Sequence, residues 1–312
     1  MHDVGIIIVT YNSEEEIGSC LDAAVKTGAE IVVVDNASVD GTLREVRRRQ
    51  VRLLANEENR GFAAAVNQGF AAVEKPFVLL LNPDVRLESP LDGMFQASTR
   101  PNAAGAGGCL KGLSGRPQIG FMVRALPRPV DFILELLLLN RIWPDNPINT
   151  QYRGLKLDYS RCIPVGQPAG AFLMIRREVW QKLGGFDEGF HPLWFEDVDF
   201  CRRATDRGYR FYFEPSAVAK HTGGHTIQRL DVEMKRIYWY RNLLRYAAKH
   251  FRPAEFRLVC VAVILGSLLR LVAEAALLRS LKPLAVYSKV IRLAGAYFYS
   301  GAKPEAVVGT CR

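Results

Sequence analysis

The sequence contains six cysteines but no Cys-x-x-Cys pair. The cysteines are scattered along the 312 residues, at Cys20, Cys109, Cys162, Cys201, Cys260 and Cys311. Without paired spacing, neither a structural zinc site nor a disulfide framework is expected. The cysteine pattern therefore favours a protein of a reducing compartment.

Two phosphate-binding motifs are also missing. No Gly-x-Gly-x-x-Gly follows the first apolar segment, and no P-loop pattern occurs in the chain. These absences argue against a dehydrogenase-type Rossmann domain and a P-loop nucleotidase. Internal repeats and low-complexity tracts are absent too, and the first residues enter a strand pattern directly, so no signal peptide is visible. A bound phosphate group would have to be held in another way, of which a metal ion is the simplest.

What is present is an ordinary globular composition, with 49% hydrophobic and 23% charged residues. A chain of this length can bury a large core, in one domain or in two. The net charge of +9 indicates an anionic partner of some kind.

Residues 77–84 (FVLLLNPD) form the most informative stretch. Five consecutive apolar residues predict a strand buried on both faces, and Asn82-Pro83-Asp84 ends it in a turn. Ligands of open α/β sheets bind at the carboxyl ends of the strands. Asp84 is therefore well placed to hold Mg²⁺ on a diphosphate, although this stretch alone slightly favours a solvated turn aspartate.

Similar strands precede this one and alternate with helices. We expect strands at residues 4–9, 31–34, 51–54 and 77–81, and helices at residues 13–26, 43–49 and 62–73. This alternation predicts an α/β fold with a doubly wound, mostly parallel sheet. Thr10, Asp35 and Asp84 each follow a strand, so all three can lie along one crevice.

The middle of the chain is less regular. Residues 85–110 are expected to form a helix and then a Gly/Ala-rich stretch at 103–108. Residues 112–164 are rich in Gly, Pro and Arg, with one periodic piece at 131–141, and are interpreted as a long insertion near the acceptor side. A strand at 172–175 and a short helix at 176–183 restore the regular pattern.

Further chemistry-bearing residues follow. Glu196, Asp197 and Asp199 lie between aromatic residues at the start of a helix, where carboxylates also favour the helix dipole. In that apolar setting Asp197 is a candidate general base. His221 and His225 lie in a Gly-rich loop (HTGGH) after an extended segment, a pattern that suits a metal ligand better than a lone histidine does.

Taken in order, these segments resemble the inverting glycosyltransferases of family 2, which have the GT-A fold. The matching segments are VTYNS, VVVDNASVDGT, NRGFAAAVNQG, LLLNPD, GAFLMIRREVWQKLGGFDEGF, FEDVDFCRR and HTGG, between about residues 4 and 225. Within the family, the set looks most like bacterial rhamnosyltransferases that build surface polysaccharides. The resemblance implies transfer of a sugar from a nucleoside-diphosphate sugar, with dTDP-rhamnose as the candidate donor, to a hydroxyl of a glycan or lipid-linked glycan.

The resemblance also assigns roles around the donor. Thr10 and Tyr11 would line the base pocket, and Asp35 would hydrogen-bond the pyrimidine. Asn82 and Asp84 occupy the ends of the family's Asp-x-Asp motif, where many members have aspartate at the first position.

In that motif Asn82 would bind a ribose hydroxyl, and Asp84 would ligate Mg²⁺ or Mn²⁺ together with His221. Asp197 matches the catalytic base. Gly61, Asn67 and Gly170 match positions near the donor or acceptor sugar.

Such a set supplies what an inverting transfer needs, which is a base on the acceptor hydroxyl and a cation on the leaving diphosphate. Three other functions are considered. A hydrolase using Asp84 and Asp197 would fit the residue types but not the nucleotide-type fold. A nucleotidyltransferase would need a glycine-rich basic loop where the chain has TYNSEEE. A non-catalytic, membrane-bound scaffold of the same fold would not need Asp84 or Asp197.

The C-terminal segment carries the basic excess. Between Lys235 and Arg292 there are twelve Lys or Arg and two Asp or Glu, which accounts for the whole net charge. The apolar run Leu258–Leu269 is shorter than the roughly 20 residues that span a bilayer, so we expect an interfacial helix at an anionic membrane surface. A core helix with a solvated basic face is the alternative, and no nucleic-acid-binding module is recognised.

The expected organisation is a GT-A domain over residues 1–230, with a nucleotide-binding half (1–110) and an acceptor half (111–230). Residues 231–312 form the helical, basic membrane-surface segment. This arrangement indicates a cytoplasmic enzyme, peripheral on the inner face of the cell membrane.

Overall fold

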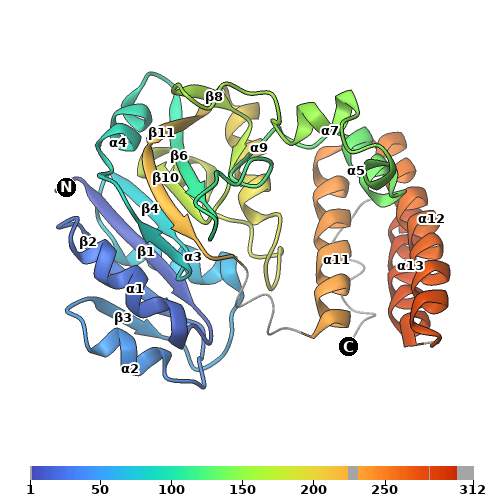
Figure 1. Ribbon diagram of the computed structural model, residues 1–312, viewed down its shortest axis with the longest axis horizontal. Helices are drawn as coiled ribbons and strands as arrows, with labels where there is room; N and C mark the ends of the chain where they lie inside the picture. Colours follow the sequence, from blue (N-terminus) through green and yellow to red (C-terminus); the bar gives the residue numbers. More distant parts are fainter. Residues whose placement is uncertain (1, 224–230, 281, 301–312) are drawn as a thin grey trace. The chain divides into compact units, whose positions relative to one another are not determined.

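The computed structural model describes residues 2–223, 231–280 and 282–300 (Figure 1). The chain divides into two compact units. Residues 1–126 and 153–229 form an α/β unit, and residues 127–152 and 230–312 form a helical unit.

The α/β unit is built on a mixed sheet. Among the described residues, nine strands pair in the order β3-β2-β1-β4-β10-β6-β11-β5, with β8 beside β11. These strands are β1 (Val4–Thr10), β2 (Glu30–Asp35), β3 (Arg52–Ala55), β4 (Phe77–Leu81), β5 (Val85–Leu87), β6 (Ala103–Lys111), β8 (Ile163–Val165), β10 (Phe172–Arg176) and β11 (Arg210–His221). Strands β7 (Val123–Arg124) and β9 (Gln167–Pro168) form a separate two-stranded sheet.

The first four strands are parallel, as the sequence predicted. Strand β10 runs antiparallel to both of its neighbours, β4 and β6, whereas β6 and β11 are parallel. The sheet is therefore mixed but mostly parallel in its N-terminal half.

Helices cover both faces of this sheet. They are α1 (Glu14–Val25), α2 (Thr42–Arg47), α3 (Phe62–Ala72), α4 (Asp92–Thr99), α8 (Arg177–Leu183) and α9 (Glu196–Asp206). Because side chains alternate along a strand, Ile6 and Ile8 of β1 enter one apolar cluster with residues of α1 and α4, while Ile7 enters another with residues of α3, α8 and α9. The doubly wound prediction is confirmed.

The Gly/Ala-rich stretch 103–108 follows a helix, α4, as expected, and it is part of the buried strand β6. A side chain at Gly105 would collide with the backbone of Met174 on β10, and one at Gly108 would collide with Phe172. Glycine allows the strands to approach closely here, at a cost in strand propensity. This is why the composition did not predict a strand.

The interpretation of residues 112–164 as one long insertion near the acceptor side is wrong for its central part, although the periodic piece at 131–141 is helical as its pattern indicated. Residues 127–152 contain α5 (Pro129–Leu136), α6 (Leu139–Ile142) and α7 (Pro147–Tyr152) and belong to the helical unit. The other helices of that unit are α11 (Val232–His250), α12 (Pro253–Leu278) and α13 (Lys282–Ser300).

Long-range contacts within the helical unit explain this placement. The guanidinium of Arg270 on α12 donates to the carbonyl oxygens of Glu135 and Leu136 at the end of α5. Glu274, one turn further along α12, binds Arg236 of α11 at 2.7 Å and Tyr287 of α13 at 2.7 Å. The α5 carbonyls lie more than a hundred residues before Arg270 in sequence, so no local pattern indicated this contact.

Helix α12 is much longer than the apolar run Leu258–Leu269 from which a helix was predicted. It has 26 residues, and an 18-residue window within it reaches a mean hydropathy of 2.2. Over the residues that the structure describes, it is the one helix long and apolar enough to cross a membrane. The count from Leu258 to Leu269 underestimated it because Arg270 lies inside the helix with its charge turned to α5 carbonyls.

Candidate active site

The carboxyl ends of β1 and β2 hold the first group of predicted residues. The hydroxyl of Thr10 donates to Asp35 Oδ1 at 2.8 Å, and both side chains are fully buried. Ser38 donates its backbone N–H to Asp35 Oδ2 at 2.9 Å and its hydroxyl to Oδ1 at 2.5 Å. Asp35 therefore organises the two loops that follow these strands, and Tyr11 is partly exposed on the first of them.

The next strand end carries Asn82 and Asp84. The N–H of Asn82 donates to the carbonyl of Ala171 at 3.0 Å, and the N–H of Val85 donates to the carbonyl of Asn82 at 3.0 Å, which closes the turn after β4. Asp84 accepts the N–H of Thr222 on its own carbonyl at 3.1 Å. This contact ties the turn to the end of β11.

The structure brings the two predicted metal ligands together. His221, the last residue of β11, places Nε2 3.3 Å from Asp84 Oδ2, and both side chains are largely buried. Neighbouring ligands of an octahedral Mg²⁺ lie roughly 3 Å apart, because each bond is about 2.1 Å long. The pair therefore fits a shared divalent cation, with further positions for phosphate oxygens and water.

Two residues that the sequence did not point to hold His221 in place. Gln118 Oε1 lies 2.8 Å from His221 Nδ1, and the ring of Phe121 stacks on the imidazole at 5.0 Å between centroids. Both residues lie in the stretch interpreted as an insertion, and neither residue type is a metal ligand of first choice. A glutamine or an exposed phenylalanine in a loop carries no signal that could have identified them.

Asp197 lies in the first turn of α9, where backbone amides surround its carboxylate. Its Oδ2 accepts the N–H of Gly170 at 3.0 Å and Nε2 of Gln167 at 3.2 Å, and its Oδ1 accepts the N–H of Val198 at 2.8 Å. Burial raises the pKa of Asp197, while these hydrogen bonds and the charge of Arg124 oppose the rise. An aspartate with a raised pKa is a stronger base than one in water.

The segment at 170–171 connects the two centres. Gly170 donates to Asp197, and the neighbouring carbonyl of Ala171 accepts from Asn82 in the turn that carries Asp84. A side chain at Gly170 would press against the Asp197 carboxylate. Gln167, which the sequence did not single out, is buried and contributes the amide that orients Asp197.

The two other carboxylates of α9 differ from Asp197. Asp199 is fully buried and accepts from Arg203 Nε at 2.7 Å, and Arg203 also donates to the carbonyls of Leu183 and Gly185. This ion pair anchors α9 to the end of α8. Glu196 is buried, and desolvation raises its pKa well above the usual range, with the charge of Asp197 acting in the same direction.

Gly61 and Asn67 are held by structural contacts. Gly61 has a φ of +84°, and a side chain there would meet His191. The Asn67 side chain pairs with the backbone of Phe186 through two hydrogen bonds of 3.0 Å and also reaches Glu188 at 2.8 Å. Asn67 thus orders the loop before α9.

Two observations concern the number of side chains that could bind a metal ion. His225 lies outside the described residues. Among the residues that are described, no group of three or more His, Cys, Asp or Glu side chains is arranged to hold a metal ion. A cation at Asp84 and His221 would therefore need ligand atoms from the nucleotide.

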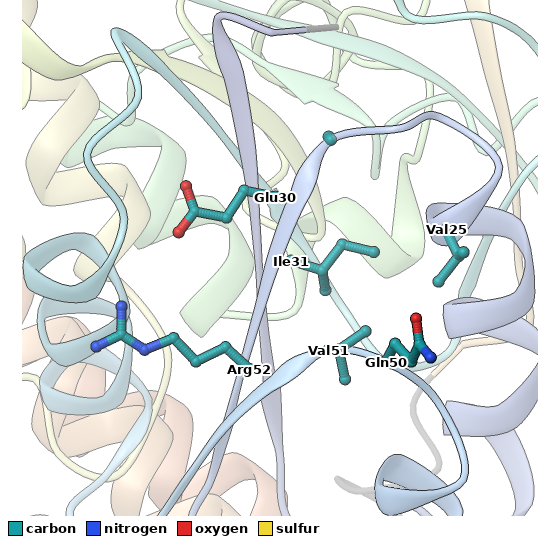
Figure 2. A pocket seen from close by; sticks show the side chains of 7 residues that line it. Val25, Glu30, Ile31, Gln50, Val51 and Arg52 are labelled. Carbon is teal, nitrogen blue, oxygen red and sulfur yellow. The ribbon is translucent and has the colours of Figure 1, made fainter.

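A pocket of about 260 Å³ lies at the amino ends of β2 and β3, whereas the predicted site lies at the carboxyl ends of the strands. Figure 2 shows the labelled side chains that line it, which come from the end of α1, the first residues of β2 and the segment that leads into β3: Val25, Glu30, Ile31, Gln50, Val51 and Arg52. Asp35 is the last residue of β2, whereas Glu30 is its first. The pocket therefore lies away from the predicted site and contributes nothing to it.

The mostly parallel sheet with helices on both faces has the GT-A type of fold. The chain belongs to glycosyl transferase family 2, whose model matches residues 5–184. A second model, glycosyl transferase family group 2, matches residues 151–300.

Curated relatives include bacterial rhamnosyltransferases. The N-acetylglucosaminyl-diphospho-decaprenol L-rhamnosyltransferase of Mycobacterium tuberculosis is 29% identical over 242 residues, which cover 72% of this chain and 77% of that protein. Rhamnosyltransferase WbbL of Escherichia coli is 25% identical over 259 residues, covering 79% of this chain and 93% of WbbL. These relatives confirm the rhamnosyltransferase-like character that the motifs indicated.

Solved structures confirm the fold. The mannosyltransferase PcManGT from Pyrobaculum calidifontis, in complex with GDP-Man and Mn²⁺, superposes with a TM-score of 0.53 at 20% identity, covering 98% of this chain and 85% of that one. GalNAc-T7 with UDP, GalNAc and Mn²⁺ gives a TM-score of 0.54 at 15% identity, covering 79% of this chain and 48% of GalNAc-T7.

Proposed function

We propose that this glycosyltransferase transfers a sugar, with inversion, from a nucleoside-diphosphate donor to a hydroxyl of a lipid-linked glycan in bacterial surface polysaccharide synthesis. One observation carries the proposal. The turn with Asn82 and Asp84 and the carboxylate of Asp197 are joined through Gly170 and Ala171 by two hydrogen bonds of 3.0 Å. The groups that would bind the donor diphosphate and the acceptor hydroxyl are thus fixed by one rigid segment.

The reaction needs no covalent intermediate in this arrangement. The acceptor hydroxyl loses its proton to Asp197 as its oxygen bonds to the anomeric carbon, and the bond to the diphosphate breaks on the opposite face. A divalent cation, when bound, offsets the charge that develops on the leaving diphosphate. The amide contacts from Gly170 and Gln167 keep the base oriented through the step.

Asp84 and His221 would hold this cation, which is Mg²⁺ or Mn²⁺. A set with one carboxylate and one imidazole suits Mn²⁺ at least as well as Mg²⁺, and PcManGT and GalNAc-T7, which are similar in fold, were determined with Mn²⁺. Asn82 lacks the charge of the usual first aspartate and would bind a ribose hydroxyl.

We assign the donor side to residues 1–110 and the acceptor side to the rest of the α/β unit. Thr10 and Tyr11 would border the base and Asp35 would set the loops around it, while Gly61, Asn67 and Gly170 would shape the sugar site. The rhamnosyltransferase relatives favour dTDP-rhamnose as the donor.

The donor assignment is tested by product release. The full chain is mixed with Mn²⁺ or Mg²⁺, a polyprenyl-diphosphate-linked sugar, and each of a panel of nucleotide sugars. With dTDP-rhamnose we expect release of dTDP that depends on acceptor and cation, and a rise in melting temperature because the ligand binds the folded state. Release from UDP-sugars alone would reject rhamnose, and no release from any donor would support a non-catalytic scaffold.

The lipid-linked acceptor would bring the enzyme to a membrane surface, and α12 offers the contact. Leu258, Val261, Leu265, Leu268 and Val272 are exposed, and their spacing of three and four residues places them on one face. The exposed face from Leu258 to Leu278 is about 30 Å long. The basic balance of the surrounding segment matches anionic lipid headgroups.

Vesicle flotation tests this surface. We expect the full chain to float with vesicles containing anionic lipid, less so at high salt, and Leu265→Glu with Val272→Glu to reduce the bound fraction severalfold. Leu113→Glu is the matched control, because Leu113 is 70% exposed in the α/β unit. Point substitutions are preferable to truncation, since removing α12 would uncover α5. Equal flotation of the double variant and the wild type would show that the exposed face of α12 does not bind the membrane.

A further inference from the structure

Gln118 makes two hydrogen bonds to a single residue. Its Nε2 donates to the backbone carbonyl of His221 at 3.2 Å, and its Oε1 lies 2.8 Å from His221 Nδ1. The main chain of Gln118 is fixed as well, since its N–H donates to the carbonyl of Leu110 at 2.8 Å and its carbonyl accepts the N–H groups of Phe121 and Met122 at 3.0 Å. The amide is therefore held in one place and faces one partner.

The carbonyl of His221 determines which way the amide points. A carbonyl oxygen only accepts hydrogen bonds, so the amide NH₂ must face it. With the NH₂ in that position, Oε1 must face Nδ1, and this contact requires a proton on Nδ1. The opposite orientation of the amide would bring Oε1 against the carbonyl oxygen of His221 and would lose the hydrogen bond to that carbonyl.

The position of this proton determines whether the Nε2 atom that faces Asp84 carries a lone pair or a proton. A neutral imidazole that carries its proton on Nδ1 has a lone pair on Nε2. That lone pair points at the Asp84 carboxylate, whose Oδ2 is 3.3 Å away. Two electron-rich atoms at this distance need a positive group between them, either a second proton on Nε2 or a metal ion, and stacking of Phe121 on the ring keeps the imidazole facing that group.

We propose that Gln118 is a positioning residue for a divalent cation. It commits His221 to the tautomer that binds metal through Nε2 and aims that lone pair at the ion shared with Asp84. The inference rests on the proposed metal site and adds the residue that orients its histidine ligand. Outer groups of this kind commonly change metal affinity by about 10- to 100-fold when they are removed.

The test measures metal binding directly, with Mn²⁺ as the probe. Free Mn²⁺ is followed by electron paramagnetic resonance with the full chain alone and with UDP or dTDP added. Gln118→Leu keeps the size of the side chain but cannot accept from Nδ1, so we expect about 10- to 100-fold weaker Mn²⁺ binding. Gln118→Glu still accepts from Nδ1, so its affinity should stay within a few-fold of the wild type.

A double-substitution cycle separates this role from a general effect on the loop. If Gln118 acts through the histidine, Gln118→Leu should change Mn²⁺ affinity very little once His221→Ala is present. A loss of the same size in both backgrounds would contradict the proposal, as would full Mn²⁺ affinity in Gln118→Leu. Unchanged Mn²⁺ binding in Asp84→Ala and His221→Ala would instead reject the metal site itself.

Discussion

Replacing Asp197 with asparagine should lower kcat by about two to four orders of magnitude, the usual contribution of a general base. Asparagine keeps the size of the side chain and an oxygen for the N–H of Gly170, so the fold and donor binding should survive. The measurement is turnover with saturating donor, together with nucleoside diphosphate affinity. Near-normal turnover would transfer the role of base to Glu196 or Asp199, the other two carboxylates at the start of α9.

The pH dependence gives an independent check on Asp197. Burial raises its pKa, so the acidic limb of kcat/KM in the wild type should lie above the ordinary aspartate range, with activity lost as the pH falls through that raised pKa.

Stability should respond to pH in a matching way. A folded-state pKa above the unfolded one favours the folded state most at low pH, and this advantage is lost as the pH rises through the folded-state pKa. The melting temperature of Asp197→Asn relative to the wild type should therefore increase with pH. A difference that does not change with pH would contradict the raised pKa.

Replacing Asp84 with alanine should abolish the metal-dependent part of nucleotide binding. The carboxylate is the only charged ligand offered by the turn after β4, and His221 alone presents one neutral nitrogen to a hard cation. The measurement is calorimetric titration with dTDP and with UDP, each with Mn²⁺ and with a chelator.

Asp92→Ala is a suitable control for this experiment, because Asp92 is an exposed carboxylate at the start of α4 and its removal changes the net charge equally. It should bind nucleotide as the wild type does. If Asp84→Ala binds nucleoside diphosphate with undiminished affinity and the same dependence on metal, the assignment of Asp84 is wrong.

The sequence predicted the parts of the fold whose signals are local. Continuous apolar runs identified β1, β2 and β4, and the polar residues that end them identified the edge where Thr10, Asp35 and Asp84 lie. Proximity of Asp84 and His221 was predicted from family motifs 137 positions apart, and the structure confirms that they are neighbours.

What could not be predicted depends on contacts between distant segments. Gln118 and Gln167 are amides in irregular stretches, and they gain a role only because β11 ends beside one and α9 begins beside the other. Strand β6 was missed because its glycines are required by close packing, which sequence propensity counts against a strand. The periodic piece at 131–141 indicated α5, but its place in the helical unit was missed because its partner, α12, comes more than a hundred residues later.

The separation of α5 from α12 also fixes an order of events during synthesis. A ribosome adding roughly 5–20 residues per second makes α5 on the order of ten seconds before α12. The last strand of the sheet, β11, ends at His221, ahead of α11. The α/β unit can therefore complete its sheet while α5 still waits for its partner, so the catalytic part of a nascent chain is assembled before its most apolar helix leaves the exit tunnel.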